Sequence, residues 1–138
     1  MPVLRCAPSC HVEFNATPLS GVPLKPAGFR ILCELCNMAK DWYQDLEVTS
    51  GSEGQHSGPT DPHKRGEAID LRSNNMASLA EKQGFVQSLI IRLCDKVGER
   101  VFEVSGGWAN DHFFAFLEDA GKPNEHIHIQ RRHNTAYP

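Results

Sequence analysis

The segment from Ser78 to Gly98 restricts the fold more than any other, because it carries a complete set of helix signals. Ser78 and Glu81 have the spacing of a capping box, in which two side chains satisfy backbone N–H groups at a helix start. Gly98 is suited to end a helix, since glycine readily adopts the left-handed conformation found there. Apolar residues recur between these ends at helical spacing, at Val86, Leu89, Ile90, Leu93 and Val97. One face of the predicted helix must therefore pack against a core.

A second helix is expected to begin at Pro26, because the missing N–H of proline is not needed in the first helical turn. Apolar residues follow it at helical spacing, at Phe29, Leu32, Leu35, Cys36, Ala39 and Trp42 or Tyr43. Runs rich in β-branched, aliphatic and aromatic residues predict strands at 46–49, 68–71, 101–104, 113–116 and 126–129. This arrangement favours an α+β fold, a small single domain with a mostly antiparallel sheet flanked by helices.

The chain has 138 residues, which is the usual size of one domain. Residues 1–25 contain four prolines and little periodicity, so we expect an extended N-terminal arm, with the domain proper at 26–138. The formal charge of −3 argues against a general nucleic-acid binder. Apolar runs are far shorter than the roughly 20 residues that cross a bilayer, so no membrane insertion is expected. The start lacks a secretory signal, which favours a cytoplasmic protein or delivery by another route.

The five cysteines are odd in number, which does not suit a complete disulfide framework. Two pairs are closely spaced, Cys6 with Cys10 and Cys33 with Cys36, and could together hold a second, structural metal ion. Alternatively, Cys33 and Cys36 are small buried hydrophobic residues of the first predicted helix. No cysteine lies near a histidine cluster, so we expect the cysteines to be mostly reduced and non-catalytic.

Two groups of residues could carry chemistry. His63 and Asp70 lie seven positions apart across a loop-to-strand passage, and Glu125, His126 and His128 lie within four residues. On a strand, His126 and His128 point to the same face. Imidazole nitrogens and carboxylate oxygens are natural Zn²⁺ ligands, and three of them with an open position form a catalytic site. His63, Asp70 and one histidine of the pair would then be ligands, with Glu125 as the base.

Each group also has a purely structural interpretation. A His-x-His on a strand often decorates a surface, and an aspartate before an apolar run often stabilises a turn. Trp108 either forms a pocket wall or fills a gap in the core. The two groups together favour a metal site, because their combination is a known one.

Three blocks of the sequence resemble one family of zinc peptidases. The blocks are Ser50-Gly51, His63-x-x-Gly66-x-Ala68-Ile69-Asp70-Leu71 and Glu125-x-x-His128. They are similar to motifs of the zinc D-alanyl-D-alanine carboxypeptidases and dipeptidases and of the L-alanyl-D-glutamate endopeptidases of phage lysins. Ser105-Gly106-Gly107-Trp108 is similar to a Gly-Gly-x-Trp segment of the lysin endopeptidases. The stretch from Thr49 to Asp70, with His126-Ile127-His128, also resembles the amino-terminal signalling domain of hedgehog proteins, which has the same fold.

The resemblance implies a role for each matching residue. His63, Asp70 and His128 would bind Zn²⁺, Glu125 would be the general base, and His126 would stabilise the oxyanion. The sequence departs from the family at Ser52-Glu53, where many members have an aromatic residue and an arginine that binds substrate. Another cation, drawn from Lys64, Arg65 and Arg72, would then replace that arginine.

The resemblance implies a zinc metallopeptidase that hydrolyses a peptide bond in peptidoglycan stem peptides, of the D-Ala-D-Ala carboxypeptidase or L-Ala-D-Glu endopeptidase type. The alternative is a non-catalytic, hedgehog-like zinc-binding module that recognises a partner. A phage virion or lysis component is a third possibility, in which the same peptidase is released to the cell wall by another route.

Overall fold

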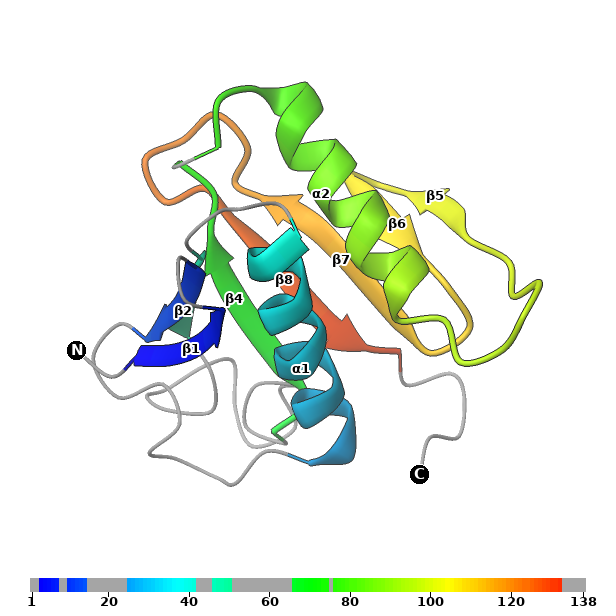
Figure 1. Ribbon diagram of the computed structural model, residues 1–138. Helices are drawn as coiled ribbons and strands as arrows, with labels where there is room; N and C mark the ends of the chain where they lie inside the picture. The colour runs from blue at the N-terminus through cyan, green and yellow to red at the C-terminus, as the bar shows by residue number, and fades with distance from the viewer. Residues whose placement is uncertain are drawn as a thin grey trace.

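The computed structural model describes residues 3–7, 10–14, 25–41, 46–50, 66–74 and 76–132, with only the backbone described for 3–7, 10–14 and Ser50. Two helices and eight strands make up this part of the chain (Figure 1). In chain order they are β1 (Val3–Ala7), β2 (Cys10–Phe14), α1 (Pro26–Asp41), β3 (Leu46–Ser50), β4 (Ala68–Arg72), α2 (Leu79–Arg92), β5 (Phe102–Val104), β6 (Gly107–Ala109), β7 (Phe113–Glu118) and β8 (His126–Arg131).

The strands form one sheet in the order β1-β2-β3-β4-β8-β7-β6-β5. The six strands from β3 to β5 in this order pair antiparallel with their neighbours. A hairpin of β1 and β2 extends the sheet through a parallel pairing of β2 with β3. The predicted α+β domain with a mostly antiparallel sheet is therefore confirmed. The expected N-terminal arm contributes this hairpin to the sheet, and the division of the chain at residue 25 stays a prediction.

Both helices lie on the same face of the sheet (Figure 1). Strand residues that point toward the helices alternate with residues that point away, as the period of two requires. The core between sheet and helices contains Ile69 and Leu71 of β4, Ile127 and Ile129 of β8, and Phe113, Ala115 and Leu117 of β7. Trp108 is half-buried and packs against this core, which agrees with its structural interpretation. The opposite face of the central strands is left to polar and aromatic side chains.

Helix α2 begins as predicted but ends earlier. The Ser78 hydroxyl accepts a hydrogen bond from the Glu81 backbone N–H at 3.1 Å, as a capping residue should. Val86, Leu89, Ile90 and Leu93 are buried as predicted. The helix ends at Arg92 and Val97 is fully exposed, so the extension of the helix and of its apolar stripe to Val97 is wrong. Side chains from remote parts of the sequence bind the carbonyls of the last helical turn. Asn110 donates to the Ile90 oxygen at 2.9 Å, and Arg30 donates to the Arg92 oxygen at 3.1 Å.

Helix α1 begins at Pro26 as predicted, and its core face includes Ile31, Leu35 and Met38. Phe29, by contrast, is 55% exposed, so it does not belong to the buried face. Strand β6 was not predicted. A turn at Gly106, which has φ of +75°, precedes it, and Gly107 lies so close to β7 that a Cβ atom there would approach the Ala115 oxygen to 1.9 Å.

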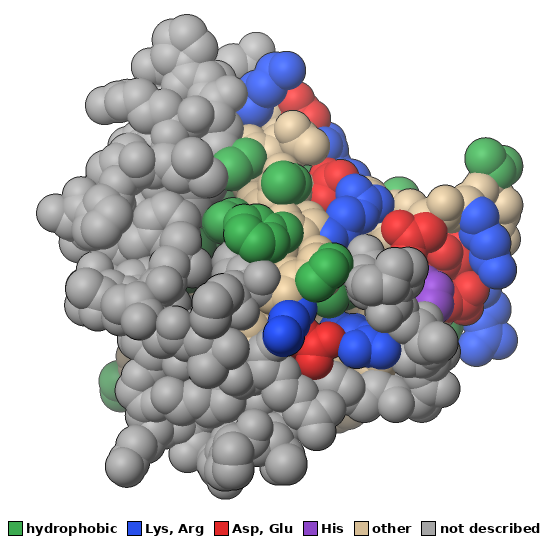
Figure 2. Space-filling view, turned by 90° about the horizontal axis from the view of Figure 1, so that it is seen from below, with side chains coloured by type: hydrophobic (Ala, Val, Ile, Leu, Met, Phe, Trp, Pro, Cys, Tyr) green, Lys and Arg blue, Asp and Glu red, His purple; other side chains and the backbone are tan. Residues whose placement is uncertain are grey.

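Charged side chains of both signs are interleaved on the described part of the face in Figure 2. Ion pairs join segments that are distant in the described chain, for example Arg92 with Asp41 at 2.7 Å and Lys96 with Asp111 at 3.3 Å. In the described part of the chain, no helix is both long and apolar enough to span a bilayer.

Candidate metal centre and adjoining pockets

The helix-free face of the sheet brings two of the predicted ligands together. Asp70 on β4 lies directly opposite His128 on β8 in the antiparallel register. The His128 Nδ1 atom is 2.9 Å from the Asp70 Oδ1 atom, and both side chains are largely buried. The two residues are 58 positions apart in the sequence, so the sheet alone creates this contact.

A glutamine orients the His128 ring from its other side. His128 Nε2 is 2.8 Å from the Gln130 Oε1 atom, and the Gln130 amide nitrogen donates to the Arg131 carbonyl oxygen at 2.9 Å. The Arg131 bond assigns the Gln130 oxygen to the side facing His128, so His128 Nε2 carries a proton and donates. The Nδ1 atom is consequently the ring nitrogen that faces Asp70.

The same contacts set the protonation of His128. Burial lowers the pKa of His128, but the hydrogen bond and charge of Asp70, the hydrogen bond to Gln130 and the charge of Glu118 outweigh burial. The pKa of His128 is therefore raised above its ordinary value. Without a metal ion, a proton between His128 Nδ1 and Asp70 Oδ1 is favoured, and a metal ion must displace that proton to bind.

His126 lies on the same face as His128, as the strand period predicts. Its Nδ1 atom is 2.8 Å from the Asn124 carbonyl oxygen. Its Nε2 atom is 2.5 Å from Glu118 Oε2 and 3.7 Å from Asp70 Oδ2. His126 is therefore next to the Asp70–His128 pair, and its Nε2 atom is closer to the carboxylate of Glu118 than to that of Asp70.

Glu125 lies just before β8, in a turn in which its N–H donates to the Lys122 carbonyl oxygen at 3.0 Å. Its Oε1 atom accepts from the Ser73 hydroxyl at 2.8 Å and from the Lys82 ammonium, and its Oε2 atom accepts from the Gly121 N–H at 2.7 Å. The Gly121 hydrogen bond, followed by those of Lys82 and Ser73, lowers the pKa of Glu125 to about 2.

A pocket of about 330 Å³ adjoins these groups. Asp70, Glu125 and His126 line it, together with Arg72, whose guanidinium is 2.7 Å from Glu47 Oε2. Of the cations considered as a replacement for the family's arginine, Arg72 is the one described here, because Lys64 and Arg65 lie outside the described residues. His63, the third predicted ligand, also lies outside the described residues, as does the segment from Gly51 to Glu53.

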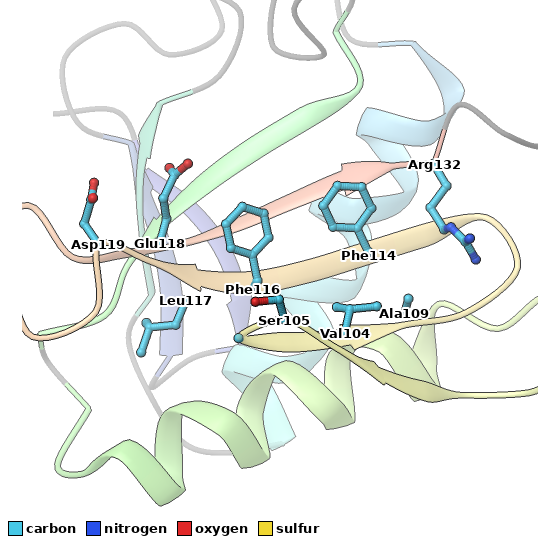
Figure 3. Close-up of a pocket in the computed structure, with 10 residues that line it drawn as sticks. Val104, Ser105, Ala109, Phe114, Phe116, Leu117, Glu118, Asp119 and Arg132 are labelled. Atoms are coloured by element: carbon cyan, nitrogen blue, oxygen red, sulfur yellow. The ribbon is translucent and has the colours of Figure 1, made fainter.

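A second pocket, of about 610 Å³, is lined by residues of β5, β6 and β7 and by Arg132 (Figure 3). The rings of Phe114 and Phe116 stand on one side of β7, with the carboxylates of Glu118 and Asp119 at one end and Arg132 at the other. The Phe116 ring, which lines the pocket, has its centroid 5.3 Å from that of His128, so the pocket wall contacts one candidate metal ligand.

Sequence reasoning missed several residues of this site. Period-two alternation could have placed Gln130 and Glu118 on the face of His126 and His128, since both follow strand spacing. Asp119 has no such signal. One oxygen each from Glu118 and Asp119 and a ring nitrogen of His126 lie within 4.8 Å of one another, so a cation could also bind there.

The described residues include the side chains of Cys33, Cys36 and Cys94. Cys36 packs against the core, as expected of a small hydrophobic residue, whereas Cys33 is exposed. Burial is the main cause that raises the pKa of the Cys94 thiol, which disfavours the thiolate. Side chains of Cys6 and Cys10 lie outside the described residues, so a second metal held by them stays a prediction.

Comparisons of the chain with protein-family models, with curated proteins and with solved structures found no match. The motif residues and the geometry of Asp70, His128 and their neighbours therefore carry the functional argument.

Proposed function

We propose that this chain is a zinc metallopeptidase that hydrolyses a peptide bond in peptidoglycan stem peptides, as a D-Ala-D-Ala carboxypeptidase or an L-Ala-D-Glu endopeptidase. The observation that carries the proposal is the Asp70–His128 pair, with Gln130 behind it. A metal-binding histidine usually donates its second ring N–H to an oxygen acceptor, which leaves the first nitrogen for the metal. His128 has this arrangement, and its metal-facing nitrogen is 2.9 Å from a carboxylate oxygen.

The donor atoms suit zinc. Zinc bonds of about 2.0–2.2 Å in a tetrahedral site place two ligand atoms about 3.4 Å apart. The Nδ1 to Oδ1 separation of 2.9 Å is about half an ångström shorter than this. Small rotations of the two side chains can move the atoms apart by that amount. Asp70, His128 and His63 would hold the ion, with His63 assigned by its motif alone. Bound zinc would act as a Lewis acid toward the substrate carbonyl and lower the pKa of a bound water.

The residues of the 330 Å³ pocket would do the remaining work. Glu125 would accept the proton of the attacking water, and His126 would stabilise the developing oxyanion. Arg72 is partly exposed in the pocket wall and would attract a carboxylate of the substrate. Proton transfer by a positioned group commonly contributes about 10²–10⁴ in rate.

One observation favours the second candidate, a non-catalytic zinc-binding module. Three donors hold the Glu125 carboxylate, and a pKa of about 2 makes it a weak base at neutral pH. A base of this kind becomes effective only if substrate or metal binding loosens its contacts with Gly121, Lys82 and Ser73.

Metal analysis and peptide digestion test the proposal in order. Purified wild-type protein should hold zinc, Asp70→Ala should lose most of it, and the matched control Asp41→Ala should keep it, because Asp41 pairs with Arg92 at the surface. The protein should then cut purified muropeptides in a chelator-sensitive way, with the products identified by mass. Absence of zinc from the wild-type protein would overturn the proposal. Bound zinc without any cleavage would favour the non-catalytic module.

A further inference from the structure

We infer that the 610 Å³ pocket is a binding site for a basic side chain, a primary ammonium on an aliphatic stem. The inference rests on the proposed function only in taking the ligand to be a peptide. Ligand pockets usually have volumes of about 300–1,000 Å³ and a mostly apolar lining with few polar groups. Here the apolar lining includes Val104, Phe114 and Phe116, and the charged groups lie at the two ends.

The charge at one end selects the ligand. Glu118 and Asp119 place two carboxylates at one end of the pocket (Figure 3). Glu118 is also next to His126. Within the described residues, Glu118 Oε2 faces His126 and Asp119 Oδ2 accepts from the Asn124 amide at 2.8 Å. The second oxygen of each carboxylate is thereby left to accept from a ligand. Asp119 also adopts a φ of +54°, a conformation that is uncommon outside glycine and that aims its side chain at this end.

The aromatic rings set the length and polarity of the stem. Phe114 and Phe116 stack with centroids 5.8 Å apart and provide a flat apolar surface. Phe116 and Glu118 are two residues apart on one strand, so their Cβ atoms are about 6–7 Å apart. A four-carbon stem such as that of lysine is about this long, which lets it lie on Phe116 with its ammonium at Glu118. A cation beside an aromatic face is itself favourable.

Arg132, at the opposite end of the pocket, would orient the bound ligand. Arg132 donates to the Asn110 carbonyl oxygen at 2.7 Å and lies over the Phe102 ring at 5.3 Å. The guanidinium is thereby fixed at the pocket rim, where its other N–H groups can meet an acidic group of the same peptide. Because the pocket adjoins His128, a basic residue bound in it would hold a neighbouring peptide bond beside the candidate metal ligands.

The experiment compares two probes that differ in one group, Nα-acetyl-lysine amide and Nα-acetyl-norleucine amide. Their dissociation constants are measured by calorimetry on the whole chain with a chelator present. Two partly exposed carboxylates should make the lysine probe bind about tenfold more tightly. The double variant Glu118→Gln, Asp119→Asn should abolish this preference, since asparagine tolerates positive φ. Glu103→Gln, an exposed carboxylate outside the pocket, should leave the preference unchanged.

Equal affinity for both probes, no binding of either probe, or an equal effect of Glu103→Gln would overturn the inference. In a separate titration without chelator, displacement of the lysine probe by Ca²⁺ would overturn it too, since the carboxylates with His126 would then be a metal site. Phe116→Leu should weaken both probes alike. Because binding is measured without metal, lysine preference without hydrolysis would refute the peptidase alone, and hydrolysis without preference would refute the pocket alone.

Discussion

Replacing Gln130 by methionine tests the metal centre through a residue that touches no metal. The substitution keeps the size of the side chain but removes the oxygen that lies 2.8 Å from His128 Nε2. Zinc binding needs an unprotonated Nδ1, which leaves the proton on Nε2. In the variant, that N–H would be buried without an acceptor when zinc is bound.

The magnitude follows from comparing the two states of the variant. Without metal, His128 can carry its proton on Nδ1 and donate to Asp70, so it loses little. With metal, the unsatisfied N–H costs about 1–3 kcal/mol, since His128 is only 8% exposed. The difference corresponds to about a 10- to 100-fold loss of zinc affinity, the range typical for loss of a partner behind a metal-binding histidine.

Competition with a chromophoric chelator measures the zinc affinity, and thermal unfolding of the metal-free protein checks the fold. Gln130→Glu keeps an acceptor and should stay within a few-fold of wild type. Gln83→Met makes the same change at a glutamine that donates to the Gly106 carbonyl oxygen, away from the metal ligands, and should have no effect. Unchanged zinc affinity in Gln130→Met, with a normal fold, would refute the orientation argument.

Three further outcomes are expected. Glu125→Gln should keep zinc at the wild-type level while turnover of muropeptides falls by about 10²–10⁴. If His126→Ala is inactive while Glu125→Gln stays active, His126 rather than Glu125 is the base. The stability that Glu125 contributes is present above the ordinary carboxyl pKa of 4.5 and is lost as pH falls toward about 2. Lys82→Met should move this loss to higher pH, and an unchanged acid-unfolding midpoint would contradict the ion pair. Asn110→Ala should lower the free energy of unfolding by about 2–4 kcal/mol. The buried Asn110 side chain donates to the Ile90 oxygen and accepts from the N–H groups of His112 and Phe113. Denaturant unfolding measures the change, and a value below about 1 kcal/mol would argue against these contacts.

Local patterns were enough to predict much of the fold. The capping box placed the start of α2, Pro26 placed the start of α1, and period-two alternation placed His126 and His128 on one face. The predicted end of α2 was wrong because Asn110 and Arg30, which are remote in sequence, bind the carbonyls of its last turn. The helix therefore stops before Val97.

The candidate site was predictable as a set of residues but not as a geometry. A motif can name Asp70 and His128, yet only the pairing of β4 with β8 makes them direct neighbours. The polar partners of the ligands depend on the same pairing and on the side-chain layer above it. For this reason the sequence alone does not point to Gln130, which bonds the His128 ring, or to Glu118, which lies next to His126.

Glu125 shows most clearly what the sequence motif leaves open. A strand that was regular through Glu125 would turn its side chain to the helix face, so a catalytic assignment required a bend before His126. Strand β8 does begin at His126, and the turn before it carries Glu125 into the wall of the pocket that Asp70 lines. The same turn, however, delivers the carboxylate to Lys82 of α2. A base at this position must give up part of these contacts, so in the proposed enzyme the Gly121 N–H and Lys82 would together set how readily Glu125 accepts a proton.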